Sequence, residues 1–337
     1  MQTARLQQID TLRGLAAVSV MLYHYTSLFP RLYPAIGKPV ASLSLGYLGL
    51  HLFFMISGFV IFMTLERTTR ASDFLASRFS RLYPTYWCAV LLTTAGLALM
   101  GPAELQVPWN HVVINLTMFQ RLLHAHDVDG SYWTLFVELL FYAWALLVYL
   151  LGGLRRVRLL LYAALLLQLL NGMHWLPLPS LVSTLLILKF VSWFACGIAV
   201  HSLALGHEGR AGDLGLILAA TLVLGVCDGR ELALFAPAAS ALLYAAARGR
   251  MTALGSKPLL WLGRISYPLY LLHQNLGYAM LLQLKAAGIG INIAMLLVIA
   301  LMLAAATLLH HAVERPAMNA IRQRWKKRSA GAPAWTS

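Results

Sequence analysis

The chain has 337 residues, of which 60% are hydrophobic and 11% are charged. Because soluble domains carry roughly 25% charged residues, this composition excludes an ordinary soluble protein and indicates a polytopic membrane protein. The net charge of +14 does not point to nucleic acid as a partner, since such binding needs a soluble basic face and the sequence predicts none.

Apolar segments of about 20 residues, the length that crosses a bilayer core, recur from end to end of the chain. We therefore predict an all-α protein with about ten transmembrane helices. The predicted spans are residues 12–29, 46–65, 82–100, 132–151, 158–171, 181–203, 214–228, 232–247, 266–284 and 291–311. They form a single transmembrane domain over residues 1–315, followed by a basic tail over residues 316–337 that we expect to lie against anionic lipid headgroups.

The distribution of basic residues predicts that both termini are cytoplasmic. With the N-terminus inside, 20 of the 26 Lys and Arg residues fall in inner segments and 5 in outer segments, while Lys189 lies within a span. Lys and Arg are enriched on the cytoplasmic side of membrane proteins. We expect a multi-pass protein of the plasma membrane, which in a bacterium is the inner membrane.

The cysteines predict no metal site. Cys88, Cys196 and Cys227 fall in separate spans without paired spacing, so neither a metal-ligand set nor a disulfide framework is expected. We expect all three to be buried packing residues.

Two polar residues in the first apolar segment, Arg13 and His24, are the first candidates for a functional site. Charged and titratable side chains are costly in hydrocarbon, and each therefore marks a functional hypothesis. Eleven helical steps bring the two residues to within roughly 20° of one helix face, about 16 Å apart along the axis. Ala17 and Val20 lie between them on that face and would not block a ligand. The pattern predicts a cation at one end and a proton acceptor further into the membrane.

Glu138, in the segment "GSYWTLFVELLFYAW", is the only acidic residue well inside a predicted span. It is expected about 10 Å below the outer membrane edge, and His24 at about 9 Å. A carboxylate beside an imidazole fixes the tautomer of the ring and raises its basicity, as in a general base. The alternative is a structural His–Glu pair.

Arg78 and Arg81 lie three residues apart, directly before the third span, and are therefore neighbours on one helix face. Arginine offers planar bidentate donors to phosphate, so the pair predicts a binding site for a phosphorylated ligand at the inner membrane boundary. The alternative is positive-inside retention with contact to lipid headgroups, which also covers Arg67 and Arg70.

Two further spans carry polar residues at membrane depth. In the second span, Ser57 and Gly58 permit close approach of another helix, or Ser57 bonds a substrate or a neighbouring polar group. In the ninth, His273 lies near mid-membrane, with Tyr267 toward the inner side. Pro268 frees backbone carbonyl groups there, which neighbouring groups or a lined cavity must satisfy.

Taken in chain order, these segments resemble the acyltransferase-3 family of integral-membrane O-acyltransferases. The segments similar to the ordered signatures of that family are "IDTLRGLAAVSVMLYHY", "LFFMISGFVIF", "FLASRFSRLYPTYW", "SYWTLFVELLFY", "GRISYPLYLLHQ" and "VERP". They run across almost the whole chain. One departure is visible, because "WTLFVE" replaces the more usual serine-rich form, although Glu138 is kept.

The resemblance implies transfer of an acyl group, commonly acetyl, from a cytoplasmic acyl-CoA such as acetyl-CoA to a hydroxyl of a carbohydrate or glycan-like acceptor. On this interpretation Arg78 and Arg81 bind the coenzyme A phosphates, and Arg13 lines the path of the pantetheine arm. His24 removes the proton of the acceptor hydroxyl as it attacks the thioester, and Glu138 orients His24; an acyl-histidine intermediate is the main variant. The candidates for contact with the substrate or the oxyanion are Ser57, Trp133, Tyr267 and His273.

A proton-coupled exporter is the competing class of protein. His24, Glu138 and His273 would then form a proton relay, and about ten spans suit either class. The lack of an inverted repeat and the order of the motifs favour the enzyme.

Overall fold

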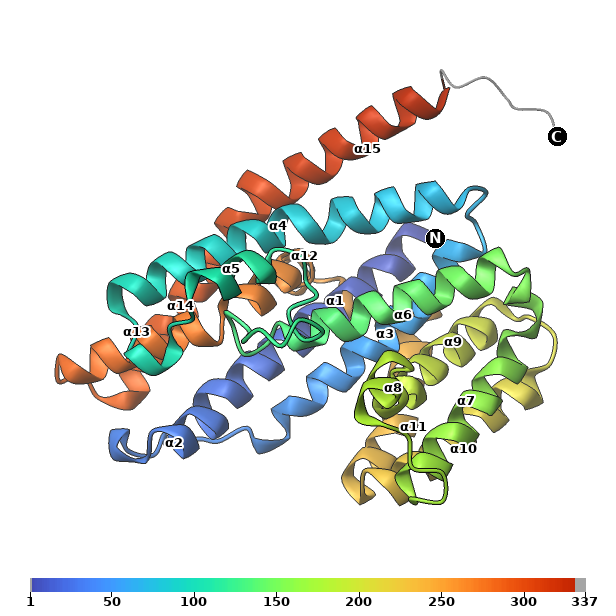
Figure 1. Ribbon diagram of the computed structural model, residues 1–337, viewed down its shortest axis with the longest axis horizontal. Helices are drawn as coiled ribbons and strands as arrows, with labels where there is room; N and C mark the ends of the chain where they lie inside the picture. Colours follow the sequence, from blue (N-terminus) through green and yellow to red (C-terminus); the bar gives the residue numbers. More distant parts are fainter. Residues whose placement is uncertain (1, 331–337) are drawn as a thin grey trace. The chain divides into compact units, whose positions relative to one another are not determined.

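The computed structural model describes residues 2–330, and every regular element in that range is helical (Figure 1). The predicted all-α class is therefore confirmed. The α-helices are α1 Gln2–Tyr23, α2 Phe29–Leu32, α3 Leu48–Leu65, α4 Ala71–Met100, α5 Trp109–Asn115, α6 Trp133–Leu150, α7 Val157–Gly172, α8 Ser180–Leu185, α9 Val191–Leu205, α10 Arg210–Cys227, α11 Arg230–Ala247, α12 Lys257–Leu272, α13 Asn275–Ala286, α14 Ile291–Leu309 and α15 Arg315–Ala330. Two π-helical segments, η1 His24–Leu28 and η8 His310–Glu314, continue α1 and α14.

Several of these helices are suited to a membrane by length and composition. Within residues 2–330, six helical segments are long and apolar enough to cross a bilayer. They are Ser44–Leu65, Ala71–Met100, Trp133–Leu150, Leu188–Leu205, Arg210–Cys227 and Ile291–Arg328. Each of the predicted apolar segments is helical over most of its length.

Helix α4 is longer than the apolar pattern predicts. It begins at Ala71 rather than at residue 82, and it continues through Pro84. The carboxylate of Asp73 in its first turn stabilises the N-terminus of the helix dipole. Arg78 and Arg81 consequently lie on the same helix as the apolar span that follows them.

Two predicted spans are interrupted. The segment 181–203 is divided between α8 and α9 at Ile187, which has a φ of 48°, and a β-branched residue in that conformation is uncommon. The segment 266–284 is divided at residues 273–274, between α12 and α13. Pro268 lies inside α12 without ending it, so the break comes later in the chain than the proline.

The chain divides into two compact units, each built from separate stretches of sequence. The first unit contains the residues up to Leu28, Ala41–Arg67 and Trp133–Ser266. The second contains Phe29–Val40, Thr68–Tyr132 and the residues from Tyr267 onward. The division into a domain over 1–315 and a tail over 316–337 stays a prediction; α15 belongs to the second unit, and residues 331–337 lie outside the described residues.

Small residues bring the helices of the first unit close together. A Cβ atom at Gly58 of α3 would collide with the backbone of Phe194, and one at Gly197 of α9 would collide with the backbone of Met55. A Cβ at Gly14 of α1 would likewise meet the backbone at Gly263 of α12. Close approach of small residues is a common way to pack helices in membranes, so the packing role expected at Gly58 is confirmed.

In the second unit, the loop before α6 is tied to the start of α13. Asp129 is fully buried and accepts hydrogen bonds from Ser131 N (2.9 Å), Ser131 Oγ (2.6 Å) and Asn275 N (2.8 Å). The side chain of Asn275 donates in return to Val128 O at 3.0 Å. These bonds satisfy backbone groups at the break between α12 and α13, where the helical ladder stops.

Candidate functional site

Arg13 and His24 lie on one helical rod in the first unit. α1 runs without interruption to Tyr23, and His24 is the first residue of the π-helical segment η1. π-helical turns are rare and occur frequently at functional sites. Ala17 and Val20, which separate the two residues on the predicted face, are 1% and 3% exposed. That face is therefore packed inside the protein. Arg13 lies 3.9 Å from the carboxylate of Asp10, one helical turn earlier.

Glu138 lies in a cluster of hydroxyl groups in the first unit. Ser57 Oγ on α3 donates to Glu138 Oε1 at 3.2 Å, and Tyr142 OH, one turn further along α6, donates to the same oxygen. Ser57 therefore bonds a neighbouring polar group, one of the two roles considered for it. His24 is not among the described hydrogen-bond partners of Glu138, so their proposed cooperation stays a prediction.

Tyr142 was missed at the sequence level, although a signal was available. Residues four apart on a helix are neighbours, and a tyrosine four residues after a membrane-buried glutamate is placed to donate to it. The cluster of Ser57, Glu138 and Tyr142 leaves Glu138 Oε2 for a further donor, because both hydrogen bonds go to Oε1.

Arginines from two distant parts of the sequence gather in the second unit. Arg322 on α15 donates from Nε to Ser80 Oγ on α4 at 3.3 Å. It lies close enough to Arg78 and Arg81 for their positive charges to repel. Trp325 Nε1, on the same face of α15, donates to Asp73 at 2.7 Å and holds the two helices together.

The arginine cluster, defined as Arg78, Arg81 and Arg322, has the chemistry of an anion site. Three like charges at one place are unfavourable unless an anion offsets them, and guanidinium groups match the geometry of phosphate oxygens. Sequence analysis found Arg78 and Arg81 but missed Arg322, because that residue lies in a basic segment far along the chain.

Tyr267 and His273 lie near the break between α12 and α13 in the second unit. Tyr267 OH donates to Leu82 O of α4 at 2.9 Å. His273 is fully buried, and its Nδ1 lies 2.8 Å from Tyr270 O. Both side chains thus have structural partners, and their roles toward a substrate stay predictions.

Trp133, at the start of α6, lines a polar cavity of the first unit. The cavity has a volume of about 560 Å³ and is also lined by Tyr47, His51, Lys189, Asp228 and Glu231. A second cavity of about 370 Å³ shares Lys189, Phe190 and Asp228 with it and reaches Gln168 on α7. We call the two together the polar cavity. Of its residues, only Trp133 was a candidate from sequence.

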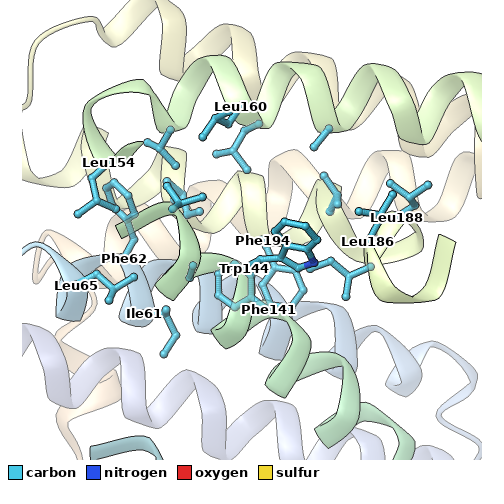
Figure 2. Close-up of a pocket in the computed structure, with 18 of the residues that line it drawn as sticks. Ile61, Phe62, Leu65, Phe141, Trp144, Leu154, Leu160, Leu186, Leu188 and Phe194 are labelled. Carbon is cyan, nitrogen blue, oxygen red and sulfur yellow. The ribbon is translucent and has the colours of Figure 1, made fainter. Parts of the chain in front are cut away.

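An apolar cavity of about 280 Å³ lies elsewhere in the first unit, between α3, α6, α7 and α9 (Figure 2). Its lining is aliphatic and aromatic, with Phe62, Phe141 and Phe194 among the side chains. The one polar group on these side chains, Trp144 Nε1, already donates to Leu185 O at 2.8 Å. This cavity can hold hydrocarbon but supplies no acid, base or anion-binding group.

A carboxylate–imidazole pair that sequence analysis missed lies at the end of α3. Glu66 Oε2 is 2.9 Å from Nε2 of the fully buried His201, and Glu66 Oε1 is 3.9 Å from His207. Glu66 and His201 are distant in sequence and share no motif, so only the fold brings them together. Within residues 2–330, no group of three or more His, Cys, Asp or Glu residues could hold a metal ion.

Comparison with known proteins decides the class to which these residues belong. The family model described as an acyltransferase domain, that of the acyltransferase-3 family, matches residues 6–311. The chain belongs to the acyltransferase-3 family. The match includes every site residue proposed from sequence, whereas Arg322 lies beyond it.

Individual relatives of this acyltransferase-3 protein agree with that assignment. It is 25% identical to acyltransferase MdmB of Streptomyces mycarofaciens, over 99% of this chain and 97% of the relative. It is 31% identical to nodulation protein 10 of Rhizobium leguminosarum bv. viciae, over 40% of this chain and 41% of the relative. It is 32% identical to the exopolysaccharide production protein ExoZ of Rhizobium meliloti, over 33% of this chain and 37% of the relative. No solved structure matches the chain significantly.

Membership of the acyltransferase-3 family favours the enzyme over the proton-coupled exporter that a His and a Glu in predicted spans also allowed. The multi-pass membrane character expected from composition agrees with the six apolar helices.

Proposed function

We propose that this acyltransferase moves an acyl group, with acetyl as the first candidate, from cytoplasmic acyl-CoA to a hydroxyl of a carbohydrate or glycan-like acceptor. The arginine cluster is the observation that carries the donor assignment. Coenzyme A presents phosphate groups, and Arg78, Arg81 and Arg322 offer several planar donors to such groups. Among the relatives, the name of an exopolysaccharide production protein supports a glycan as the acceptor.

Each unit is assigned its own part of the reaction. In the second unit, the arginine cluster binds the donor phosphates. In the first unit, Arg13 lines the path of the pantetheine arm and His24 takes the proton of the acceptor hydroxyl. The hydroxyl oxygen then bonds to the thioester carbonyl carbon, the carbon–sulfur bond breaks, and the leaving thiolate receives the proton from His24.

Glu138 is the proposed positioning residue. Ser57 and Tyr142 both bind its Oε1, so the carboxylate is held by two donors and Oε2 is assigned to His24. An imidazolium that forms at His24 during proton transfer is stabilised by such a carboxylate. The oxyanion of the tetrahedral intermediate is assigned to a donor among Ser57, Trp133, Tyr267 and His273.

The proposed membrane arrangement has about ten crossings, with both termini in the cytoplasm of the cell. The excess of Lys and Arg in the predicted inner segments supports it, as do helices at each of the predicted spans. The plasma membrane of a bacterium, its inner membrane, is the proposed location. Reporter fusions after residue 330 and within 101–131 test the arrangement, with a cytoplasmic and an external signal expected, respectively.

The donor assignment is tested with purified protein in liposomes and radiolabelled acetyl-CoA. We expect release of free coenzyme A that depends on an added glycan acceptor, with the label recovered in the glycan. Arg322→Ala should raise the KM for acetyl-CoA by about tenfold, because one charge-assisted hydrogen bond to the donor is lost. Arg324→Ala, which removes an exposed cation from the same helix, is the matched control and should change it little. Equal KM values in the two variants would remove Arg322 from the donor site.

A further inference from the structure

The polar cavity has the size of a small-molecule site. Its two parts, of about 560 and 370 Å³, share Lys189, Phe190 and Asp228. Ligand pockets in proteins commonly measure about 300–1,000 Å³. All of the residues that line it belong to the first unit. They come from the turn before α3, the starts of α3, α6 and α11, the ends of α7 and α10, α8, and the segment 187–190 before α9.

Charge in the polar cavity is balanced, in contrast to the arginine cluster. Its positively charged side chains are Lys189 and Arg230, and its negatively charged side chains are Asp228 and Glu231. Such a lining gives an anion no net attraction. It suits an uncharged ligand that carries many hydroxyl groups, each of which both donates and accepts hydrogen bonds.

Two buried polar atoms of residues that line the cavity have no protein partner. Gln168 is 3% exposed; its Oε1 accepts from Ser192 Oγ at 2.7 Å, while its Nε2 makes no hydrogen bond. Asp228 Oδ2 is also buried without a partner. A buried polar atom without a hydrogen bond is costly. Gln168 and Asp228, two residues of the cavity wall, thus hold one donor and one acceptor that the protein leaves unused.

Aromatic side chains complete the lining. The ring centroid of Trp133 lies 5.6 Å from that of Phe190, and Tyr47 OH donates to Glu231 at 2.8 Å. Rings of this kind cover the apolar C–H face of a ligand while polar groups at the rim bind its edge. Aromatic faces combined with amide, carboxylate and ammonium groups match the two-sided chemistry of a sugar ring.

The cavity lies close to the Glu138 cluster along two helices. Trp133 precedes Glu138 by five residues on α6, and His51 precedes Ser57 by six residues on α3. These separations correspond to about 7.5 and 9 Å along the helix axes. Measured along the two helix axes, the lining residues Trp133 and His51 therefore lie within about two helical turns of Glu138 and Ser57.

We propose that the polar cavity is the acceptor site and that it takes an uncharged, hydroxyl-rich sugar ring. Trp133 covers one face of the ring, Gln168 and Asp228 bind its hydroxyl groups, and Lys189 binds at the open rim. The proposal rests on the proposed function, since it needs a glycan acceptor.

The test uses the protein in liposomes with radiolabelled acetyl-CoA and the glycan fraction extracted from cells that lack this gene, which carries the unmodified acceptor. Two half-saturating concentrations are measured, one for the glycan and one for acetyl-CoA. Trp133→Leu and Asp228→Asn should each raise the half-saturating concentration of the glycan by at least tenfold. Each should change the half-saturating concentration of acetyl-CoA less than twofold. Lys189→Gln replaces an exposed side chain, so it keeps the test valid if the variants of the half-buried Trp133 and Asp228 fail to fold. It should raise the half-saturating concentration of the glycan about threefold.

The matched control is Trp144→Leu, which removes a tryptophan from the same helix, α6, where it lines the apolar cavity instead. It should leave both values near those of the wild type. The acceptor site would be overturned, and the proposed function would stand, if the cavity variants kept the wild-type half-saturating concentration of the glycan. An equal rise of that concentration in Trp144→Leu would have the same meaning. Failure of the wild-type protein to label any glycan would instead overturn the proposed function itself.

Discussion

Two carboxylates, the half-buried Glu138 in the first unit and the buried Asp129 in the second, are held in different ways. Asp129 is fully buried, and two of its three donors are backbone N–H groups, whose positions are fixed by the fold. Among the described residues, Glu138 accepts hydrogen bonds from the side-chain hydroxyls of Ser57 and Tyr142, both at one oxygen. Asp129 uses both oxygens to hold a loop against α13, whereas both described hydrogen bonds of Glu138 go to Oε1.

The kind of donor that holds each carboxylate distinguishes a structural acid from a functional one. A carboxylate that satisfies backbone N–H groups replaces a missing part of secondary structure. A carboxylate held by hydroxyl groups in the middle of a span has no such duty, and its cost in the membrane needs another explanation. We expect substitutions of Glu138 to affect the reaction and substitutions of Asp129 to affect stability.

The largest effect is expected for Glu138→Gln. The amide keeps the shape and an oxygen for Tyr142 but cannot stabilise a charged imidazole, so acetyl transfer should fall by about 10²–10³-fold. The thermal midpoint of the purified protein should change little. A large fall in the midpoint with an unchanged rate per folded molecule would make Glu138 structural, like Asp129.

Asp129→Ala should act in the opposite manner. It leaves the N–H groups of Ser131 and Asn275 without their acceptor, so the free energy of unfolding should fall by about 2–4 kcal/mol. Thermal unfolding in detergent measures this, and the rate per folded molecule should be preserved. Glu104→Ala, which changes an exposed acid in the same inter-helix region, is the control. Wild-type stability in Asp129→Ala would refute the structural role.

Tyr142→Phe should produce a smaller change, a fall of about tenfold in the transfer rate, because one hydrogen bond to the carboxylate is lost. Tyr162→Phe is the matched control, since it removes a hydroxyl that donates to Gly212 O at 2.9 Å elsewhere in the first unit. The two variants should lose similar stability while only Tyr142→Phe loses rate. Equal rates would show that the orientation of Glu138 does not matter.

The smallest effect is a pH dependence of stability in the second unit. Burial raises the pKa of Asp129 from its ordinary value of 3.8 to about 6. Between these values the folded protein binds more protons than the unfolded chain, so the contribution of Asp129 to stability falls as the pH rises toward 6 and is constant above that. Between pH 4 and pH 6, the thermal midpoint of the wild type should therefore fall relative to that of Asp129→Asn. A constant difference over this range would contradict the assignment.

Hydropathy and residue spacing predicted much of the helical framework but not where helices end or break. A run of about 20 apolar residues is enough to predict a span, and Glu138 and Ser57 were identifiable because polar residues are rare there. The start of α4 at Ala71 and the break at Ile187 depend on local backbone interactions that hydropathy does not record.

The parts of the site that escaped prediction depend on tertiary contacts. Arg322 meets Arg78 and Arg81 only because α15 packs on α4. Gln168 and Asp228 become notable only when the fold buries them beside one cavity. Spacing along one helix could have identified Tyr142, but no sequence pattern joins residues from different helices.

The most direct test of the proposed mechanism is acceptor-dependent acetyl transfer by a His24→Ala protein whose folding is verified by its thermal midpoint. We predict a fall of about 10²–10⁴-fold relative to the wild type, the usual contribution of a general base, with binding of acetyl-CoA retained. Transfer at close to the wild-type rate would contradict the account, because neither direct proton removal nor an acyl-histidine intermediate could then involve His24.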